Sequence, residues 1–173
     1  MSTTPVIAHN GCLDILAANP LGRALFSDIY DSPTRRSAAA PPNMASFVFL
    51  DPAGGEFYAD LDDAADTTVR ILRAQAASTP HDSRLTSLVG ELSTRSEDFR
   101  ARWGAHDVGR HRAGSKTLHH REVGDLVFGF EELTLDSIPS ITLSAYIAEP
   151  ASPTAERLQL LAALALTATP ARP

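Results

Sequence analysis

Arg73 and His106 are the side chains in this sequence best suited to bind a polar ligand group. Arg73 follows an acidic cluster in a helical pattern, and its guanidinium could hold a ligand carboxylate through paired, charge-assisted hydrogen bonds. The alternative, which we favour, is a solvated arginine or an ion pair with Asp62 or Asp66. His106, three residues after Trp103, could sense pH or bond a head group, because imidazole titrates near neutrality. A contact at a helix C-terminus is the simpler role for this histidine.

Asn19 and Asn43 each stand where a helix is expected to begin. Either amide could face the mouth of a ligand pocket or cap the helix. Asparagine is among the best N-cap residues, because its side chain accepts a hydrogen bond from a free backbone N–H group of the first turn. We therefore favour capping at both positions, with a ligand contact as the alternative.

The remaining chemically capable residues do not form a recognisable metal site or acid–base pair. Cys12 is the only cysteine, which excludes an intramolecular disulfide and a thiolate-rich metal site built from this chain. His119 and His120 lack further ligands at a typical spacing, and neighbouring strand residues point to opposite faces. The same alternation separates Glu131 from Glu132, so this pair is poorly placed for acid–base catalysis.

Motifs of common enzyme classes are absent from the sequence. It contains no Gly-x-Ser-x-Gly elbow, no Walker loop and no dinucleotide-binding glycine pattern, and Ser93 lies inside a predicted helix. We expect no catalysis, no metal and no cofactor. A hydrolase that uses His106 or His120 would have to show turnover that a His→Ala substitution abolishes.

Composition indicates one folded domain. The chain has 173 residues, of which 43% are hydrophobic and 21% charged. Its 15 Lys and Arg against 21 Asp and Glu give a net charge of −6, so it lacks the electropositive surface that nucleic-acid binding needs. The N-terminus is unlike a signal peptide, and the apolar tract Leu158–Leu166 is far shorter than the roughly 20 residues of a membrane-spanning helix. We expect a soluble, cytoplasmic protein.

The first half of the chain predicts a hairpin followed by short helices. Two apolar runs around Asn10-Gly11 indicate a β-hairpin with a type I′ turn over residues 6–17. A short helix begins at Pro20, a proline-rich loop covers residues 32–42, and a further helix spans residues 44–50 before Gly54-Gly55. A longer helix follows the acidic residues 60–63, with apolar residues at positions 65, 69, 72 and 76.

The second half predicts one long helix, a set of strands and a closing helix. A single apolar stripe marks the helix at Leu85, Leu88, Val89, Leu92, Phe99 and Trp103. Alternating apolar residues predict antiparallel strands over residues 126–130, 133–135 and 141–147. The inward parity changes after Phe130, so we expect a β-bulge near Glu131 and Glu132. Leu158–Leu166 predicts the closing helix.

The order of these elements indicates an α+β fold with one antiparallel sheet of about five strands and helices over one face. We expect residues 5–166 to form the domain, residues 1–4 to be disordered and residues 167–173 to be a flexible tail. The cup between sheet and helices would hold a small molecule. Its predicted walls are apolar residues that also belong to the core, namely Phe47, Leu72, Leu88, Leu92, Phe99 and Trp103.

Several blocks of the sequence resemble the MmyB-like ligand-binding domain. They are LDILAANPLGRAL (13–25), NMASFVFLDP (43–52), the segment 69–108, HHREVGDL (119–126) and LSAYIAEPAS (143–152). Arg121 stands where that family usually has proline, Leu61 where tryptophan is common, and Gly55 near a usual arginine. The resemblance implies a PAS-like fold that is normally joined to an XRE-type helix-turn-helix domain in bacterial transcription regulators. It also implies an apolar ligand, with fatty acids as the known class.

Our leading hypothesis is a sensor that binds an apolar small molecule and modulates a helix-turn-helix DNA-binding domain. No such segment precedes the first predicted strand, so the chain is either truncated or acts on a separate DNA-binding protein. The chain itself is expected to contact no nucleic acid and no membrane, and to form a homodimer. The alternative is a protein-interaction module without a small-molecule ligand, which pairs through its helical face or the closing helix.

Overall fold

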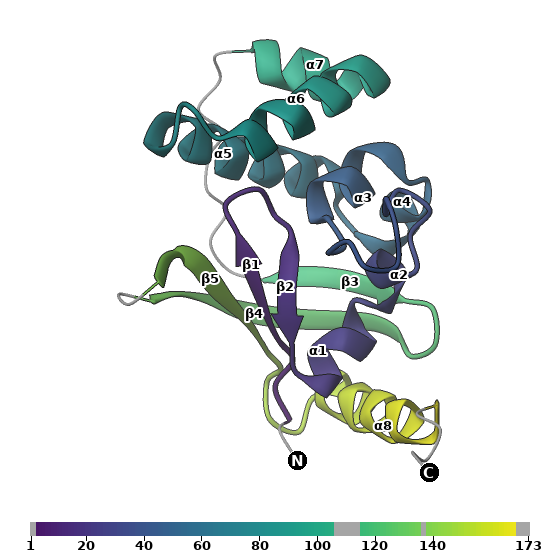
Figure 1. Ribbon diagram of the computed structural model, residues 1–173. Helices are drawn as coiled ribbons and strands as arrows, with labels where there is room; N and C mark the ends of the chain where they lie inside the picture. The colour runs from purple at the N-terminus through teal and green to yellow at the C-terminus, as the bar shows by residue number, and fades with distance from the viewer. Residues whose placement is uncertain (1–2, 106–114, 136–137, 169–173) are drawn as a thin grey trace.

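A five-stranded antiparallel sheet in the order β2-β1-β5-β4-β3 forms the centre of this computed structural model, which describes residues 3–105, 115–135 and 138–168. The strands are β1 (Val6–Asn10), β2 (Ile15–Ala18), β3 (Lys116–His120), β4 (Gly124–Leu135) and β5 (Ile138–Ile147). The sheet is curled like half a barrel, and the helices gather around its concave side (Figure 1). The pairing of β1 with β5 joins the two ends of the chain, so the predicted PAS-like α+β architecture is confirmed.

The hairpin of β1 and β2 forms as predicted, but its connection is not a type I′ turn. Four residues, 11–14, connect the strands, and Leu13 rather than Gly11 has the positive φ, at 64°. The Asn10 side-chain oxygen closes the turn by accepting the backbone N–H groups of Cys12 and Asp14, each at 3.0 Å. Gly11 lies directly under the Gln75 side chain: a Cβ there would lie 1.8 Å from Oε1 of Gln75, so a larger residue would displace the end of that side chain.

Short helices follow the hairpin. α1 (Pro20–Leu25), α3 (Met44–Leu50) and α5 (Leu61–Ser78) confirm the predicted helices, and residues 32–42 form the predicted loop. α2 (Ser27–Tyr30) and α4 (Ala53–Phe57) are additional. α3 ends at Leu50 as expected, and Gly54 lies in α4, where it lets α4 pack on α3: a Cβ there would lie 2.7 Å from the Phe47 carbonyl oxygen.

The long helix predicted from Leu85 to Trp103 is two helices. α6 (Ser83–Arg95) and α7 (Glu97–Gly104) meet at Ser96, whose extended backbone has φ −124° and ψ 117°. Ser96 accepts the backbone N–H of Phe99 at 3.1 Å and so caps α7. Because both helices bury residues of the same stripe, the apolar periodicity did not reveal the break.

The strand segments predicted at 126–130 and 133–135 belong to one strand, β4. Its register against β5 runs without interruption through Glu131 and Glu132, and the irregularity lies between Thr134 and Leu135. The expected bulge and parity change are therefore wrong. Leu133 lies on the outer face and is 57% exposed.

Two apolar cores hold the helices in place. The first lies between the concave face of the sheet and α1 to α4, with α8 (Pro153–Ala168), the predicted closing helix, at its lower edge (Figure 1). The second lies among the hairpin tip, α3, α5, α6 and α7. α5 contributes to both cores and so links the sheet to the outer helices α6 and α7. Among the described helices, none is both long and apolar enough to cross a membrane.

Candidate functional site

A cavity of about 80 Å³ lies between the concave face of the sheet and α5. Its lining residues come from four strands, β1, β3, β4 and β5, from helices α3 and α5, and from the chain segments beside them. They are His9, Leu13, Met44, Val48, Tyr58, Asp63, Ala64, Thr67, Thr68, Arg70, Ile71, Ser115, Lys116, Phe130, Glu132, Ser144 and Tyr146. The cavity is therefore apolar and aromatic in part, with polar groups at defined positions.

Two tyrosines form part of the sheet-side wall. Tyr58 and Tyr146 are 7% and 6% exposed, and burial raises the pKa of both phenols above the usual range. Both phenols therefore remain protonated at physiological pH. The ring of Tyr146 makes edge contacts with Phe26 and Phe128, which hold it against the sheet.

A buried hydrogen-bonded pair joins β1 to β5 at the cavity. His9 Nε2 lies 3.1 Å from Ser144 Oγ, and His9 Nδ1 lies 3.1 Å from the Asn10 carbonyl oxygen. Because a carbonyl oxygen can only accept, Nδ1 carries a hydrogen in this arrangement, and Nε2 shares a hydrogen bond with the Ser144 hydroxyl. The pair places polar groups inside the cup.

Lys116 places a positive charge at the cavity. Its ammonium lies 5.2 Å from the centre of the Phe130 ring, and burial lowers the pKa of Lys116, against the opposing effect of Asp63 and Glu132. Within the part of the chain that the structure describes, no carboxylate oxygen lies within ion-pairing distance of Lys116. The ammonium is thus available to an anionic ligand group.

The apolar residues predicted as pocket walls lie in the cores and do not line this cavity. Phe47 belongs to the sheet-side core, whereas four others are fully buried in the second core, with Trp103 packed against it. Those four are Leu72, Leu88, Leu92 and Phe99. Trp103 stacks on Phe99 with ring centres 5.5 Å apart.

Arg73 holds the end of α7. Its Nη2 donates to the carbonyl oxygens of Arg102 at 3.2 Å and Trp103 at 2.7 Å and to that of Ala105, and its guanidinium lies over the Trp103 ring. The ion pairs expected with Asp62 and Asp66 are made instead by Arg102, at 2.6 and 2.5 Å. That expectation for Arg73 is therefore wrong. His106 lies outside the described residues.

Asn19 and Asn43 both cap helices, which confirms the reading that we favoured. Asn19 Oδ1 accepts the backbone N–H of Gly22 at 2.7 Å, and Asn43 Oδ1 accepts that of Ser46 at 2.8 Å. The Nδ2 nitrogen of the same Asn43 amide donates to the Asp14 carboxylate at 2.8 Å.

The polar residues that β5 contributes to the cavity were not predicted from the sequence. The strand was recognised from the apolar series Ile141, Leu143, Ala145 and Ile147, yet Ser144 and Tyr146 are the buried residues and Ile147 is 46% exposed. Both faces of this strand carry apolar residues, so alternation alone does not tell them apart. The large aromatic side chain of Tyr146, which alternates with the apolar series, was the one sequence feature that indicated the buried face.

The family model described as "MmyB-like transcription regulator ligand binding domain" matches residues 1–161. No curated protein sequence matches the chain significantly. In the described parts of the chain, no group of three or more His, Cys, Asp or Glu side chains could hold a metal ion.

Proposed function

Because this chain belongs to the family of MmyB-like transcription regulator ligand binding domains, we propose that it senses an apolar small molecule with an anionic end, such as a fatty acid. The observation that carries the proposal is the unpaired Lys116 ammonium beside a cavity with aromatic walls. The carboxylate would lie near Lys116, and the acyl chain would pack against Val48, Phe130 and Tyr146. No reaction follows binding in this proposal.

The size of the cavity implies that binding moves α5. A cavity of about 80 Å³ is smaller than the roughly 150 Å³ that accommodates benzene, so an acyl chain needs more room. We propose that α5, which supplies Ala64, Thr67, Thr68 and Ile71 to the wall, is the element that moves. A ligand that fits only the opened arrangement stabilises that arrangement by its differential affinity.

The contacts of α5 carry such a movement to the outer helices. Arg102 of α7 pairs with Asp62 and Asp66 of α5, and Arg73 of α5 holds the carbonyl oxygens at the end of α7. Leu72 of α5 is fully buried in the core shared with α6 and α7. We propose that α5 to α7 shift together and change the position of an attached or partner helix-turn-helix domain.

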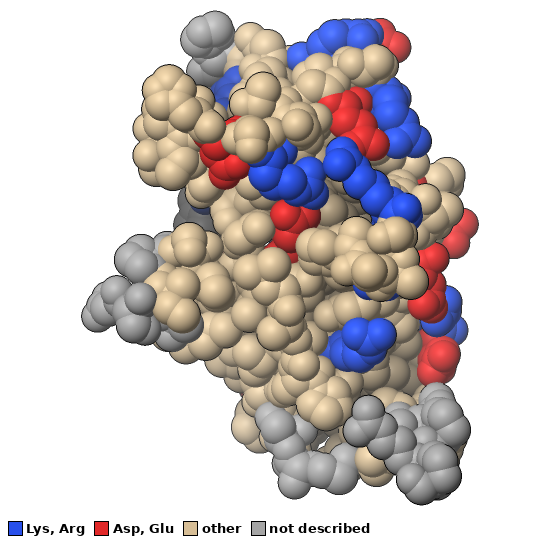
Figure 2. All heavy atoms as spheres, in the orientation of Figure 1, with Lys and Arg blue, Asp and Glu red and all other residues tan. Residues whose placement is uncertain are grey.

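We propose that the outer face of the sheet binds a second copy of the chain. Ala17, Ala8, Leu143 and Leu133 lie side by side across four strands on this face. Leu16, Val127, Leu133 and Ile147 are each between 46% and 57% exposed. In Figure 2 the surface over β1, β2 and β5 carries few charged side chains, whereas charges gather over the helices. Burial of this face in a homodimer would remove it from water.

The same exposed face favours the alternative function, a protein-interaction module without a small-molecule ligand. Mass spectrometry of the purified protein, under native and then denaturing conditions with solvent extraction, separates the two. A near-stoichiometric fatty acid or other apolar species supports the sensor. A chain that is free of ligand, and whose melting temperature added fatty acids leave unchanged, supports the interaction module.

A further inference from the structure

One donor group of Arg84 is buried without a partner. The guanidinium makes two bonds to the buried Asp14 carboxylate, from Nε to Oδ2 at 3.2 Å and from Nη2 to Oδ1 at 2.6 Å. Its third nitrogen, Nη1, is inaccessible to solvent and has no hydrogen-bond partner among the described residues. A buried donor without an acceptor costs free energy, so such a group in a native fold calls for an occupant.

Arg84 lines a second cavity, of about 150 Å³, that opens to solvent between the loop of residues 32–42, α3 and α6. It shares no lining residue with the cavity beside α5. Its polar lining comprises Thr34, Arg35, Arg36, Asn43, Ser46 and Arg84, together with Glu91. A cavity of this volume can hold about six non-hydrogen atoms, as benzene does in an apolar case.

The charges around the second cavity favour an anion. Three guanidinium groups line it against the single carboxylate of Glu91. Arg35 is directed to the loop, where it donates to the carbonyl oxygens of Tyr30, Ala38 and Ala40. Arg36 pairs with Glu91 at 2.9 Å, and Arg95 shares the same carboxylate at 2.9 Å. Even with Asp14 included, cations outnumber carboxylates at this site.

We propose that the second cavity is a binding site for a small oxyanion, a carboxylate or a phosphate of about six non-hydrogen atoms or fewer. Because Nη1 is closed to solvent in the present arrangement, the Arg84 guanidinium would turn toward the cavity so that Nη1 donates to the anion, as guanidinium groups do to carboxylate and phosphate oxygens. The hydroxyl groups of Thr34 and Ser46 in the lining offer further donors.

The site would couple an anion to the arrangement of the domain. Arg84 lies at the start of α6, Asn43 caps α3, and both bind Asp14 in the hairpin connection. An anion bound between these elements and the loop of residues 32–42 stabilises the native state by RT ln(1 + L/Kd), where L is the concentration of free anion. This inference does not rest on the proposed fatty-acid site.

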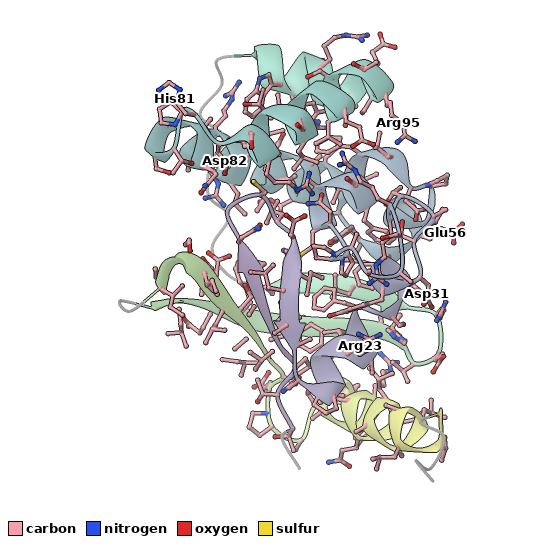
Figure 3. All side chains as sticks on the ribbon, in the orientation of Figure 1. Arg23, Asp31, Glu56, His81, Asp82 and Arg95 are labelled. Carbon is pink, nitrogen blue, oxygen red and sulfur yellow. The ribbon has the colours of Figure 1, made fainter. Side chains whose placement is uncertain are left out.

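The test is calorimetric titration of the whole chain with sodium phosphate and, separately, with sodium acetate, at an ionic strength held constant with sodium chloride. Ala40→Leu fills the cavity without changing charge, and Arg36→Gln removes a lining cation. Arg95→Gln is the matched control, because it also removes a partner of Glu91 but lies outside the cavity lining; Figure 3 shows Arg95 pointing into solvent.

The expected result is saturable binding of at least one anion, weakened about tenfold or more in Ala40→Leu and Arg36→Gln and less than about twofold in Arg95→Gln. Phosphate-only or acetate-only binding identifies the anion class. Absence of saturable binding for both anions, or equal affinities in Ala40→Leu and the unsubstituted chain, overturns the proposal. Arg84→Met is not used alone, since it also deprives Asp14 of its partner.

Discussion

The Asp14 carboxylate and the Arg84 guanidinium form a doubly hydrogen-bonded ion pair that joins the hairpin connection to α6. The Asp14 side chain is only 4% exposed, and Asn10 and Asn43 also donate to it. The carboxylate is thus a hub between sheet and helices. Figure 3 shows Asp82, the N-cap of α6, above the hairpin tip on the same junction.

Loss of this hub should destabilise the domain strongly. We expect Asp14→Ala to lower the free energy of unfolding by about 3 kcal/mol, because it leaves the Arg84 charge without its partner and removes one of the two acceptors of Asn43 Nδ2. The value is at the lower end for buried pairs, since Arg84 is 36% exposed. Urea unfolding followed by circular dichroism measures the change. Arg95→Gln, which breaks an exposed ion pair, should lower the free energy of unfolding by about 0.5 kcal/mol or less. If the two variants lose the same stability, Asp14 does not have the structural role proposed for it.

The buried charge of Lys116 should lower the stability of the folded domain while it favours ligand binding. Burial lowers its pKa below the ordinary value of 10.5, so between the two values the unfolded chain binds more protons than the folded one. Stability should therefore rise with pH across that window. Lys116→Met should flatten this rise and increase the melting temperature at neutral pH by roughly 2–4 °C, while weakening fatty-acid binding. A variant that binds as tightly as the unsubstituted chain would exclude the ammonium as the ligand contact.

Cys12 should react slowly although it is a free thiol. It is 3% exposed, and burial, with the nearby Asp82 and Asp14, raises the pKa of its thiol to about 11. At pH 8 its thiolate fraction is roughly 200-fold below that of an ordinary thiol. Alkylation by iodoacetamide, followed by mass spectrometry, should be slower by at least that factor in the native chain than in urea. Comparable rates in both states would show that the hairpin tip opens readily.

The outer face of the sheet should control association. Leu133→Asp places a charge in the apolar row across the sheet and should weaken dimerisation at least tenfold without unfolding the chain, since Leu133 is 57% exposed. Sedimentation velocity over a range of concentrations measures this. Leu166→Asp on α8, at a residue 62% exposed, is the matched control. If only the α8 variant dissociates the dimer, the copies meet through the closing helix instead.

The fold class and most elements could be predicted because turn and cap residues report local structure. Asn19 and Asn43 mark helix starts, and their capping bonds are the ones that the sequence indicates. The junction at Ser96 could not be located in this way, because α6 and α7 bury one continuous apolar stripe. The capping role of Ser96 can be recognised only when the structure shows that α6 ends and α7 begins there.

The candidate site was less predictable, since it depends on contacts between distant segments. Lys116, Tyr58 and Tyr146 meet at one cavity only after β3, β5 and α5 pack together. Arg73 was expected to bind a ligand carboxylate, to be solvated, or to pair with Asp62 or Asp66, yet its partners are carbonyl oxygens about 30 residues further along the chain. Charge pattern along a helix does not reveal such tertiary partners.

Calorimetric titration with dodecanoate tests the central claim that the cavity between the sheet and α5 binds an apolar, anionic ligand. Thr67→Trp on α5 fills this cavity, and Thr94→Trp on the exposed side of α6 makes the same substitution away from it. We expect saturable, near-stoichiometric binding to the unsubstituted chain and to Thr94→Trp, with loss of binding in Thr67→Trp. Equal binding by both variants, or no binding by the unsubstituted chain, would contradict this claim.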